Sequence, residues 1–143
     1  MKVSSILDGK RAETVKPTAT IKELVEKLAS HKIGALVVSS DGVNIEGIVS
    51  ERDIVQSMPA NFETFQNLHV RDIMTVNVMT CKKDATFAEL MVIMTQKRIR
   101  HIPIVDDSGK LISIISIGDV VKNHISEIET ERSALIDYVK SSG

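Results

Sequence analysis

Apolar residues in the first half of the chain alternate between helical spacing and short continuous runs. The apolar positions behind Thr20 recur at steps of three and four, which predicts an amphipathic helix. These positions are Ile21, Leu24, Val25 and Leu28. The pair Thr20-x-x-Glu23 is a capping-box signal for the start of this helix, because each residue can satisfy a backbone N–H of the other.

Two short apolar runs follow this helix. The run Ala35–Val38 and the run Ile45–Val49 flank a polar turn at Ser39–Gly42, which predicts a hairpin. Ser50 then opens a second helix, and a short strand is expected near Thr14–Val15. The first half therefore predicts a β-α-β-β-α unit.

The second half repeats this pattern 66 positions later without a gap. Thr20, Glu23, Ser50 and Asp53 fall on the identical residues Thr86, Glu89, Ser116 and Asp119. The corresponding elements are a strand near Val78–Met79, a helix behind Thr86, a hairpin formed by Ile102–Val105 and Leu111–Ile115, and a helix opened by Ser116. With one residue of slippage upstream, Val3–Leu7 also falls on Val70–Met74. The chain is a tandem duplication.

The duplication predicts an α+β fold made of two units, residues 1–62 and 68–143. Residues 57–69, which include Pro59 and Asn61, are expected to form the linker. Each unit is too small to bury both faces of its sheet, so the two copies are expected to pack sheet against sheet.

The last helix is expected to extend beyond the repeat. Val121, Ile125, Ile128, Leu135 and Val139 follow coiled-coil-like steps, and Arg132 interrupts the seam. Two interpretations are open: this helix docks on its own unit, or it forms a dimer contact.

Composition excludes several classes of protein. The 18 basic and 19 acidic residues give a net charge of −1, and there is no tryptophan, which argues against a nucleic-acid binder. No apolar run is long enough for a membrane helix or a secretory signal, and the single cysteine, Cys81, fits a reducing cytoplasm. The four histidines lack metal-ligand spacing, so no metal site is expected.

A serine and an aspartate recur where a strand passes into a helix, in Gly47–Asp53 and Ser113–Asp119. The simpler interpretation is a helix cap, in which Ser accepts a backbone N–H and Asp favours the positive helix end. The functional interpretation is a ligand site. Free N–H groups at a helix start bind phosphate, and a carboxylate one turn away can accept both hydroxyls of a ribose.

Cations gather in the segment Lys97–Pro103, which contains Arg100 and His101. This segment is either a solvated helix end or a phosphate clamp, since guanidinium offers forked donors to phosphate oxygens. The equivalent segment of the first copy, His31–Ala35, lacks the Arg-His pair, so two ligand sites would not be equivalent.

These motifs resemble those of CBS domains, a family named for cystathionine β-synthase. The resemblance is carried by Gly47–Asp53, Val70–Thr75, Arg100–Val105 and Leu111–Asp119, and it covers nearly the whole chain. It implies two β-α-β-β-α units paired with pseudo-twofold symmetry, with clefts between them. It also implies an adenosine-containing ligand: AMP, ATP or NAD(H), and less readily S-adenosylmethionine.

The resemblance also implies roles for individual residues. The ribose-binding acid falls on Asp53 and Asp119, and the hydroxyl contact on Ser50 and Ser116. The phosphate side falls on Arg52, Arg100 and His101. The adenine would lie against Val78 and Ile102 in one cleft, and against Val15 and Ala35 in a second, weaker one. We expect the ligand to be held by Asp119 with Arg100 and His101 nearby. Ser113 departs from the family's usual glycine, which Gly47 retains.

The chain offers no machinery for breaking bonds. Ser50 and Ser116 lack a nucleophile elbow, and neither a P-loop nor a Gly-x-Gly-x-x-Gly turn is present. We therefore expect a cytoplasmic regulatory module, and not an enzyme, that senses nucleotide level and signals to an unknown partner protein. The resemblance favours a homodimer. The alternative is a ligand-free module used only for protein interaction.

Overall fold

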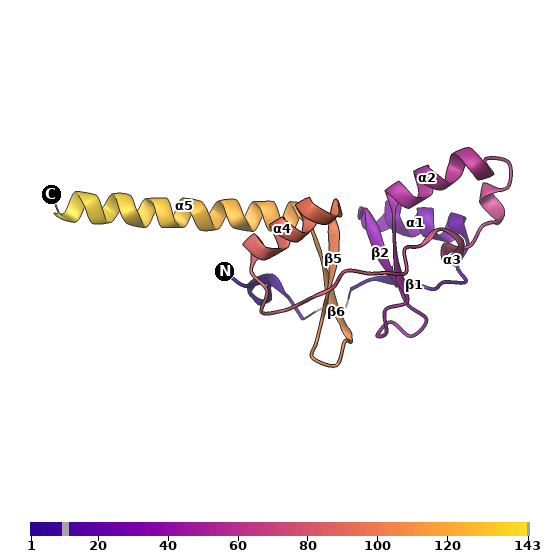
Figure 1. The fold of residues 1–143 in the computed structure, drawn as a ribbon, viewed down its shortest axis with the longest axis horizontal. Helices are drawn as coiled ribbons and strands as arrows, with labels where there is room; N and C mark the ends of the chain where they lie inside the picture. Colours follow the sequence, from indigo (N-terminus) through magenta and orange to yellow (C-terminus); the bar gives the residue numbers. More distant parts are fainter. Residues whose placement is uncertain (10–11, 143) are drawn as a thin grey trace.

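The computed structural model describes residues 1–9 and 12–142, and within them the duplicated sequence forms two small α+β units (Figure 1). The first repeat contains β1 (Thr14–Val15), α1 (Ile21–His31), β2 (Ala35–Val38), β3 (Gly47–Ser50) and α2 (Glu51–Asn61). The second contains β4 (Cys81–Lys82), α4 (Phe87–Lys97), β5 (His101–Val105), β6 (Leu111–Ser116) and α5 (Ile117–Ser142). The connecting elements are η1 (Val3–Ile6), η2 (Phe65–Asn67) and α3 (Val70–Ile73). The expected fold class is confirmed.

Each repeat builds a three-stranded sheet with the same topology. The strand order is β1-β2-β3 in one and β4-β5-β6 in the other, with one parallel and one antiparallel pair in each. The hairpin expected at residues 35–49 and its counterpart at 102–115 are therefore present.

Both predicted capping signals act at the start of a helix. The Oγ1 of Thr20 accepts the N–H of Glu23 at 3.2 Å. At the equivalent place Thr86 accepts the N–H of Glu89 at 3.1 Å, and the Glu89 carboxylate accepts the N–H of Thr86 at 3.1 Å. These bonds satisfy backbone donors that a helix leaves without internal partners.

Two sequence-based expectations about element position are wrong. The strand expected near Val78–Met79 lies three residues later, at Cys81–Lys82, because a strand of two residues carries no periodic signal that would fix its place. The expected linker also begins too early, since residues 57–61 are the last turns of α2 and Pro59 lies inside that helix. Side-chain bonds support this stretch: Ser57 donates to the carbonyl of Ile54 at 2.8 Å.

The segment that precedes each repeat packs on the other repeat. The N–H of Val3 donates to Ala85 at 2.8 Å, and the N–H of Val70 donates to Ala19 at 2.9 Å. Both valines are fully buried, Val3 in the core of the second repeat and Val70 in the core of the first. This exchange ties the two repeats together.

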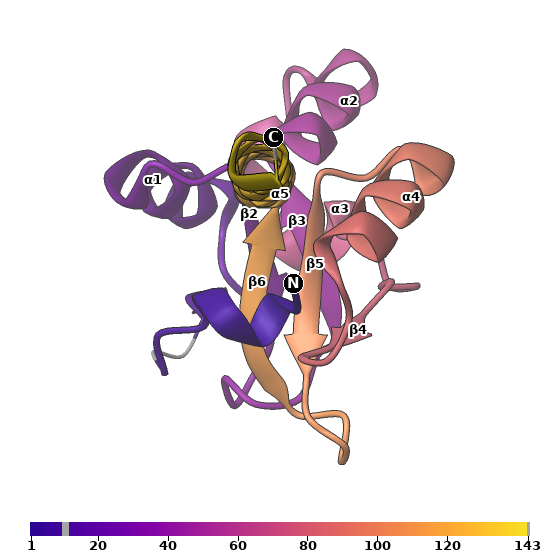
Figure 2. The ribbon, with the colours of Figure 1, turned by 90° about the vertical axis from the view of Figure 1, so that its left-hand side faces the viewer.

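The two sheets also face each other. Side chains alternate between the two faces of a strand, and on β2 Leu36 and Val38 belong to the core beneath the helices. Ala35 and Val37 point to the opposite face and are 2% and 0% exposed. The faces of the sheets turned away from the helices are therefore covered by the neighbouring repeat: β5 and β6 lie in front of β2 and β3 in Figure 2, and the two groups of strands are neighbours in Figure 1.

Helix α5 leaves the body of the molecule. Val120 is buried at its start, but every side chain from Ile128 to Ser142 is exposed. In Figure 1 this part of the helix projects beyond the second repeat. Only the beginning of α5 therefore docks on its own unit. Across residues 1–9 and 12–142, no helix combines the length and the apolar character needed to cross a membrane.

Candidate functional site

A cleft of about 690 Å³ lies between the two repeats. The first repeat contributes the starts of β2 and α2 together with β3, and the second contributes the turn between α4 and β5. The chain that joins the repeats closes the cleft, because Ile48 and Thr75 exchange two backbone hydrogen bonds of 2.9 Å. The lining residues are Gly34, Ala35, Ile48, 50–53, 75, 77–79 and 97–101.

An aspartate stands at one wall of the cleft on the first turn of α2. The Oδ2 of Asp53 accepts the N–H of Ser50 at 2.8 Å and its hydroxyl at 3.1 Å, while Ser50 Oγ accepts the N–H of Asp53 at 3.4 Å. This capping box fixes the carboxylate, and no hydrogen bond to its second oxygen, Oδ1, is seen among the described residues. The arrangement of Ser50 and Asp53 is therefore compatible with both interpretations, the helix cap and the ligand site.

Apolar side chains form another part of the wall. Ala35 and Ile48 come from the sheet of the first repeat. Val78 and Met79 come from the segment before β4, and Ile99 from the turn between α4 and β5. A flat aromatic group could stack here without leaving a polar group unpaired.

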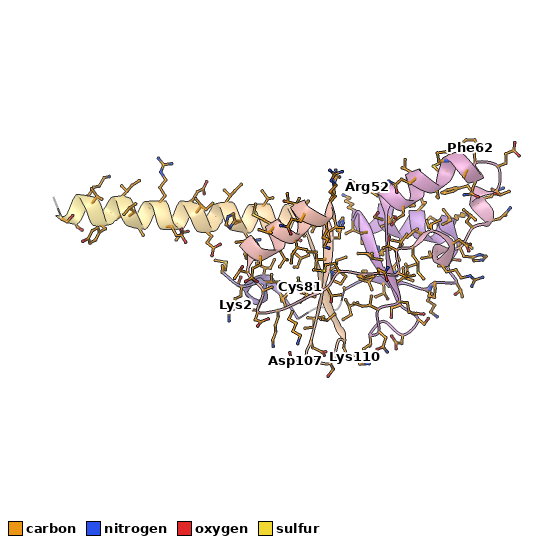
Figure 3. The ribbon with its side chains drawn as sticks, viewed as in Figure 1. Lys2, Arg52, Phe62, Cys81, Asp107 and Lys110 are labelled. Carbon is orange, nitrogen blue, oxygen red and sulfur yellow. The ribbon has the colours of Figure 1, made fainter. Side chains whose placement is uncertain are left out.

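Four cations surround the cleft: Arg52 on α2, and Lys97, Arg98 and Arg100 around the end of α4. Figure 3 labels Arg52 at the start of α2, on the side facing the second repeat. Within residues 1–9 and 12–142 none of the four forms an ion pair with a carboxylate. Since the cations come from both repeats, an anion in the cleft could contact both.

His101 bridges the repeats at the floor of the cleft. A Cβ added to Gly34 would lie 3.3 Å from Cε1 of His101, so the imidazole packs directly on the backbone of the first repeat. Burial lowers the pKa of His101, and the neighbouring Arg100 acts in the same direction, whereas the carboxylates of Glu51 and Asp119 oppose it.

The structure brings together many of the residues singled out from the sequence. Ser50, Arg52, Asp53, Val78, Arg100 and His101 all line the cleft. Ala35, expected in a second cleft, lines this one as well. The acid that shares the cleft with Arg100 and His101 is Asp53, whereas the sequence analysis paired them with Asp119.

Four predicted site residues lie elsewhere. Ile102 and Val15 are 0% and 6% exposed and belong to the two hydrophobic cores, because their side chains point to the helix-covered faces of the sheets. Ser116 and Asp119 form the same capping box as Ser50 and Asp53, with Oδ2 accepting the N–H of Ser116 at 3.1 Å. The duplication places them at the equivalent position of the second repeat, outside the lining of this cleft.

Several lining residues were not assigned from the sequence. Thr75, Asn77 and Met79 precede β4, and no periodic or charge pattern in this segment indicates that it lies against the first repeat. Lys97 and Arg98 lay in the basic segment that the sequence analysis noted, so charge clustering was the available signal for them.

Comparison with protein families gives matches in both halves of the chain. The family model described as CBS domain matches residues 3–60 and 70–125. An uncharacterized protein of Methanopyrus kandleri is 36% identical over 76% of the chain, and the mitochondrial CBS domain-containing protein CBSX3 of Arabidopsis thaliana is 34% identical over 85%. The chain spans 56% and 60% of the length of these two curated relatives.

Solved structures give the same match. A CBS-domain-containing protein of Agrobacterium tumefaciens is 40% identical with a TM-score of 0.80, and the match covers 87% of this chain and 99% of that one. Two more distant structures, each 24% identical, share the fold. A protein named CBSX2, solved in complex with AMP, has a TM-score of 0.73 and covers 87% of this chain and 97% of its own. The CBS domain pair of protein MJ0100, solved with 5-methylthioadenosine and S-adenosyl-L-methionine, has a TM-score of 0.78 and covers 89% and 98%.

Proposed function

This chain belongs to the CBS domain family, as a tandem pair, and we propose that it is a regulatory module that binds an adenine nucleotide between its two repeats. The observation that carries the proposal is the composition of the cleft. A fixed carboxylate, an apolar wall and a group of four cations meet in about 690 Å³, a volume in the range of small-molecule sites. At 24% identity the likeness to CBSX2 and MJ0100 carries the fold, so the ligand is argued from this cleft.

Each part of the cleft suits one part of such a ligand. The Asp53 carboxylate would accept the hydroxyls of a ribose through Oδ1, because Ser50 occupies Oδ2. Ala35, Ile48 and Val78 would contact the adenine, whose flat faces gain from leaving water. Arg52, Arg100 and His101 would face the phosphates.

We propose a regulatory role because the cleft lies between the two repeats. A ligand that contacts both repeats favours the arrangement in which both sets of contacts form, and it shifts the equilibrium by its differential affinity for the two arrangements. The changed surface would be sensed by a partner protein. The sequence contains neither a nucleophile elbow nor a P-loop, so we propose no enzymatic activity; its single cysteine favours a reducing compartment such as the cytoplasm.

We also propose that the module is a homodimer. Val55 on α2 and Phe62, which follows its last residue, are 63% and 74% exposed, and their equivalents on α5, Val121 and Ile128, are 37% and 50% exposed. An apolar surface that recurs on both repeats can be covered by a second copy with the same two helices.

Thermal unfolding with and without nucleotide tests the binding proposal. A ligand present at a hundredfold excess over its dissociation constant stabilises the folded state by about 2.7 kcal/mol. A rise in melting temperature with AMP, ATP or NAD(H) is the expected result. If none of these compounds shifts the transition, the alternative function, a module for protein interaction with an empty cleft, is favoured.

A further inference from the structure

The charges around the cleft bear on the kind of adenosine compound that it accepts. Four permanently positive side chains line it, whereas its carboxylates are those of Glu51 and Asp53. Hydrogen bonds from Ser50 fix the Asp53 carboxylate without removing its charge, and burial lowers the pKa of His101, which favours the neutral imidazole. With four positive and two negative side chains in its lining, the cleft is electropositive.

These cations approach from opposite sides. Arg52 belongs to α2 of the first repeat, whereas Lys97, Arg98 and Arg100 belong to the second. Like charges held close together repel one another, the carboxylates of Glu51 and Asp53 offset only part of this repulsion, and an anion placed among the cations reduces it further. A longer anionic group contacts more of them at once.

Arg98 occupies a backbone conformation that favours glycine. It ends α4 in the left-handed conformation, with φ of 55°, where glycine is the usual residue. Lys32 ends α1 in the same way, with φ of 54°, but it is not part of the cleft lining. At both positions a long basic side chain occupies a place that local conformation alone would give to glycine.

We infer that this cleft selects adenosine polyphosphates, ADP or ATP, over AMP and over S-adenosylmethionine, and that Arg98 and Arg52 are the residues that set this preference. The inference rests on the proposed adenine-nucleotide function and names its ligand class. Each added phosphate brings further negative charge and further acceptors for guanidinium groups. S-adenosylmethionine brings a positive sulfonium into a positive cleft, so the same cations oppose it.

The test compares adenosine, AMP, ADP, ATP and S-adenosylmethionine by calorimetric titration without divalent metal, at low and high salt. ATP and ADP should bind about tenfold or more tightly than AMP, since a charged hydrogen bond contributes enough for such a factor. Added salt should weaken ATP binding more than adenosine binding.

The variant Arg98→Gly and the control Lys32→Gly make this test specific. Each substitution removes one positive charge and places glycine at a backbone position with positive φ, where glycine is favoured, so neither should impair folding. Arg98→Gly should weaken ATP binding about tenfold and leave adenosine binding unchanged, whereas Lys32→Gly should leave both unchanged. Arg52→Ala should act as Arg98→Gly does.

The outcomes distinguish a failure of the proposed function from a failure of the inferred selectivity. If none of the five compounds binds, the selectivity is overturned, and if NAD(H) does not bind either, the proposed function fails with it. If adenosine compounds bind but AMP or S-adenosylmethionine binds as tightly as ATP, the proposed function stands and the selectivity is overturned. Equal effects of Arg98→Gly and Lys32→Gly on ATP would overturn the role assigned to Arg98.

Discussion

Gly47 and Thr75 lie so close that a side chain on the glycine has no room. A Cβ added to Gly47 would be 2.8 Å from the carbonyl oxygen of Thr75 and 2.8 Å from the Sδ of Met74. This close approach lets Thr75 pair with Ile48 and brings the segment that follows it into the cleft wall. Gly47 therefore positions the wall of the cleft although it is not itself one of the lining residues.

Replacing Gly47 with alanine should both destabilise the protein and disturb the cleft. The carbonyl of Thr75 is backbone and can move away only by breaking its pairing with Ile48, so we expect a loss of about 1–3 kcal/mol in the free energy of unfolding. Urea denaturation measures this loss, and nucleotide titration measures the change in the cleft. Ser113→Gly, at the equivalent position of the second repeat, is the control and should cost about 1 kcal/mol or less. A Gly47→Ala variant as stable as the parent protein would contradict this account of the close approach.

The two aspartates of the duplicated capping boxes allow a second matched test. Asp53 and Asp119 make the same bonds to Ser50 and Ser116, but only Asp53 lines the cleft. Changing either to alanine should cost about 1 kcal/mol or less of stability, since each removes one acid from a helix start. Asp53→Ala should in addition weaken nucleotide binding at least tenfold, because hydrogen bonds from ribose to a carboxylate are lost. If Asp119→Ala weakens binding at this cleft and Asp53→Ala does not, the assignment is reversed.

The two capping boxes also show which features of the structure can be predicted from the sequence. The fixed offset predicted both boxes and both helices behind them, because capping and helical spacing are local properties of the chain. Which box faces the cations is decided by how the repeats pack, and no local pattern encodes that. The same holds for Ile102, whose place in the core depends on which face of β5 the helices cover. The position of β4 was missed because a two-residue strand leaves almost no periodic signal.

His101 should make stability depend on pH. Burial lowers its pKa in the folded state, so the folded protein holds the imidazole neutral while the unfolded chain titrates near the ordinary value of 6.5. As pH falls below that value the unfolded state binds more protons, and the free energy of unfolding decreases. The facing carboxylates of Glu51 and Asp119 reduce this effect but do not reverse it.

The measurement is the free energy of unfolding of the parent protein and of His101→Gln between about pH 8 and pH 5. The parent should lose stability toward acid more steeply than the variant, because the other titrating groups are common to both. Parallel curves would show that His101 is not held neutral by burial.

The exposed end of α5 gives the last prediction. A helical stretch of about fifteen residues is marginal in water without tertiary support, yet residues 128–142 have every side chain exposed. Its apolar stripe includes Leu135, which is 64% exposed, and Val139, which is 60% exposed. A helix of this kind is stabilised by laying its stripe against another helix. The stripe continues the exposed apolar surface of Val121 and Ile128, which recurs on the first repeat, so a second copy is the partner that we propose.

Leu135→Glu should therefore convert a dimer into a monomer at micromolar concentration while nucleotide binding persists, because the substituted residue lies outside the cleft. Thr130→Glu adds the same charge on the opposite side of the helix and should leave the dimer intact, since position 130 does not share the stripe. Sedimentation analysis of the three proteins distinguishes the cases. A monomeric parent protein, or equal dissociation of both variants, would contradict a dimer held by this stripe, and the projecting helix would then need another partner to remain folded.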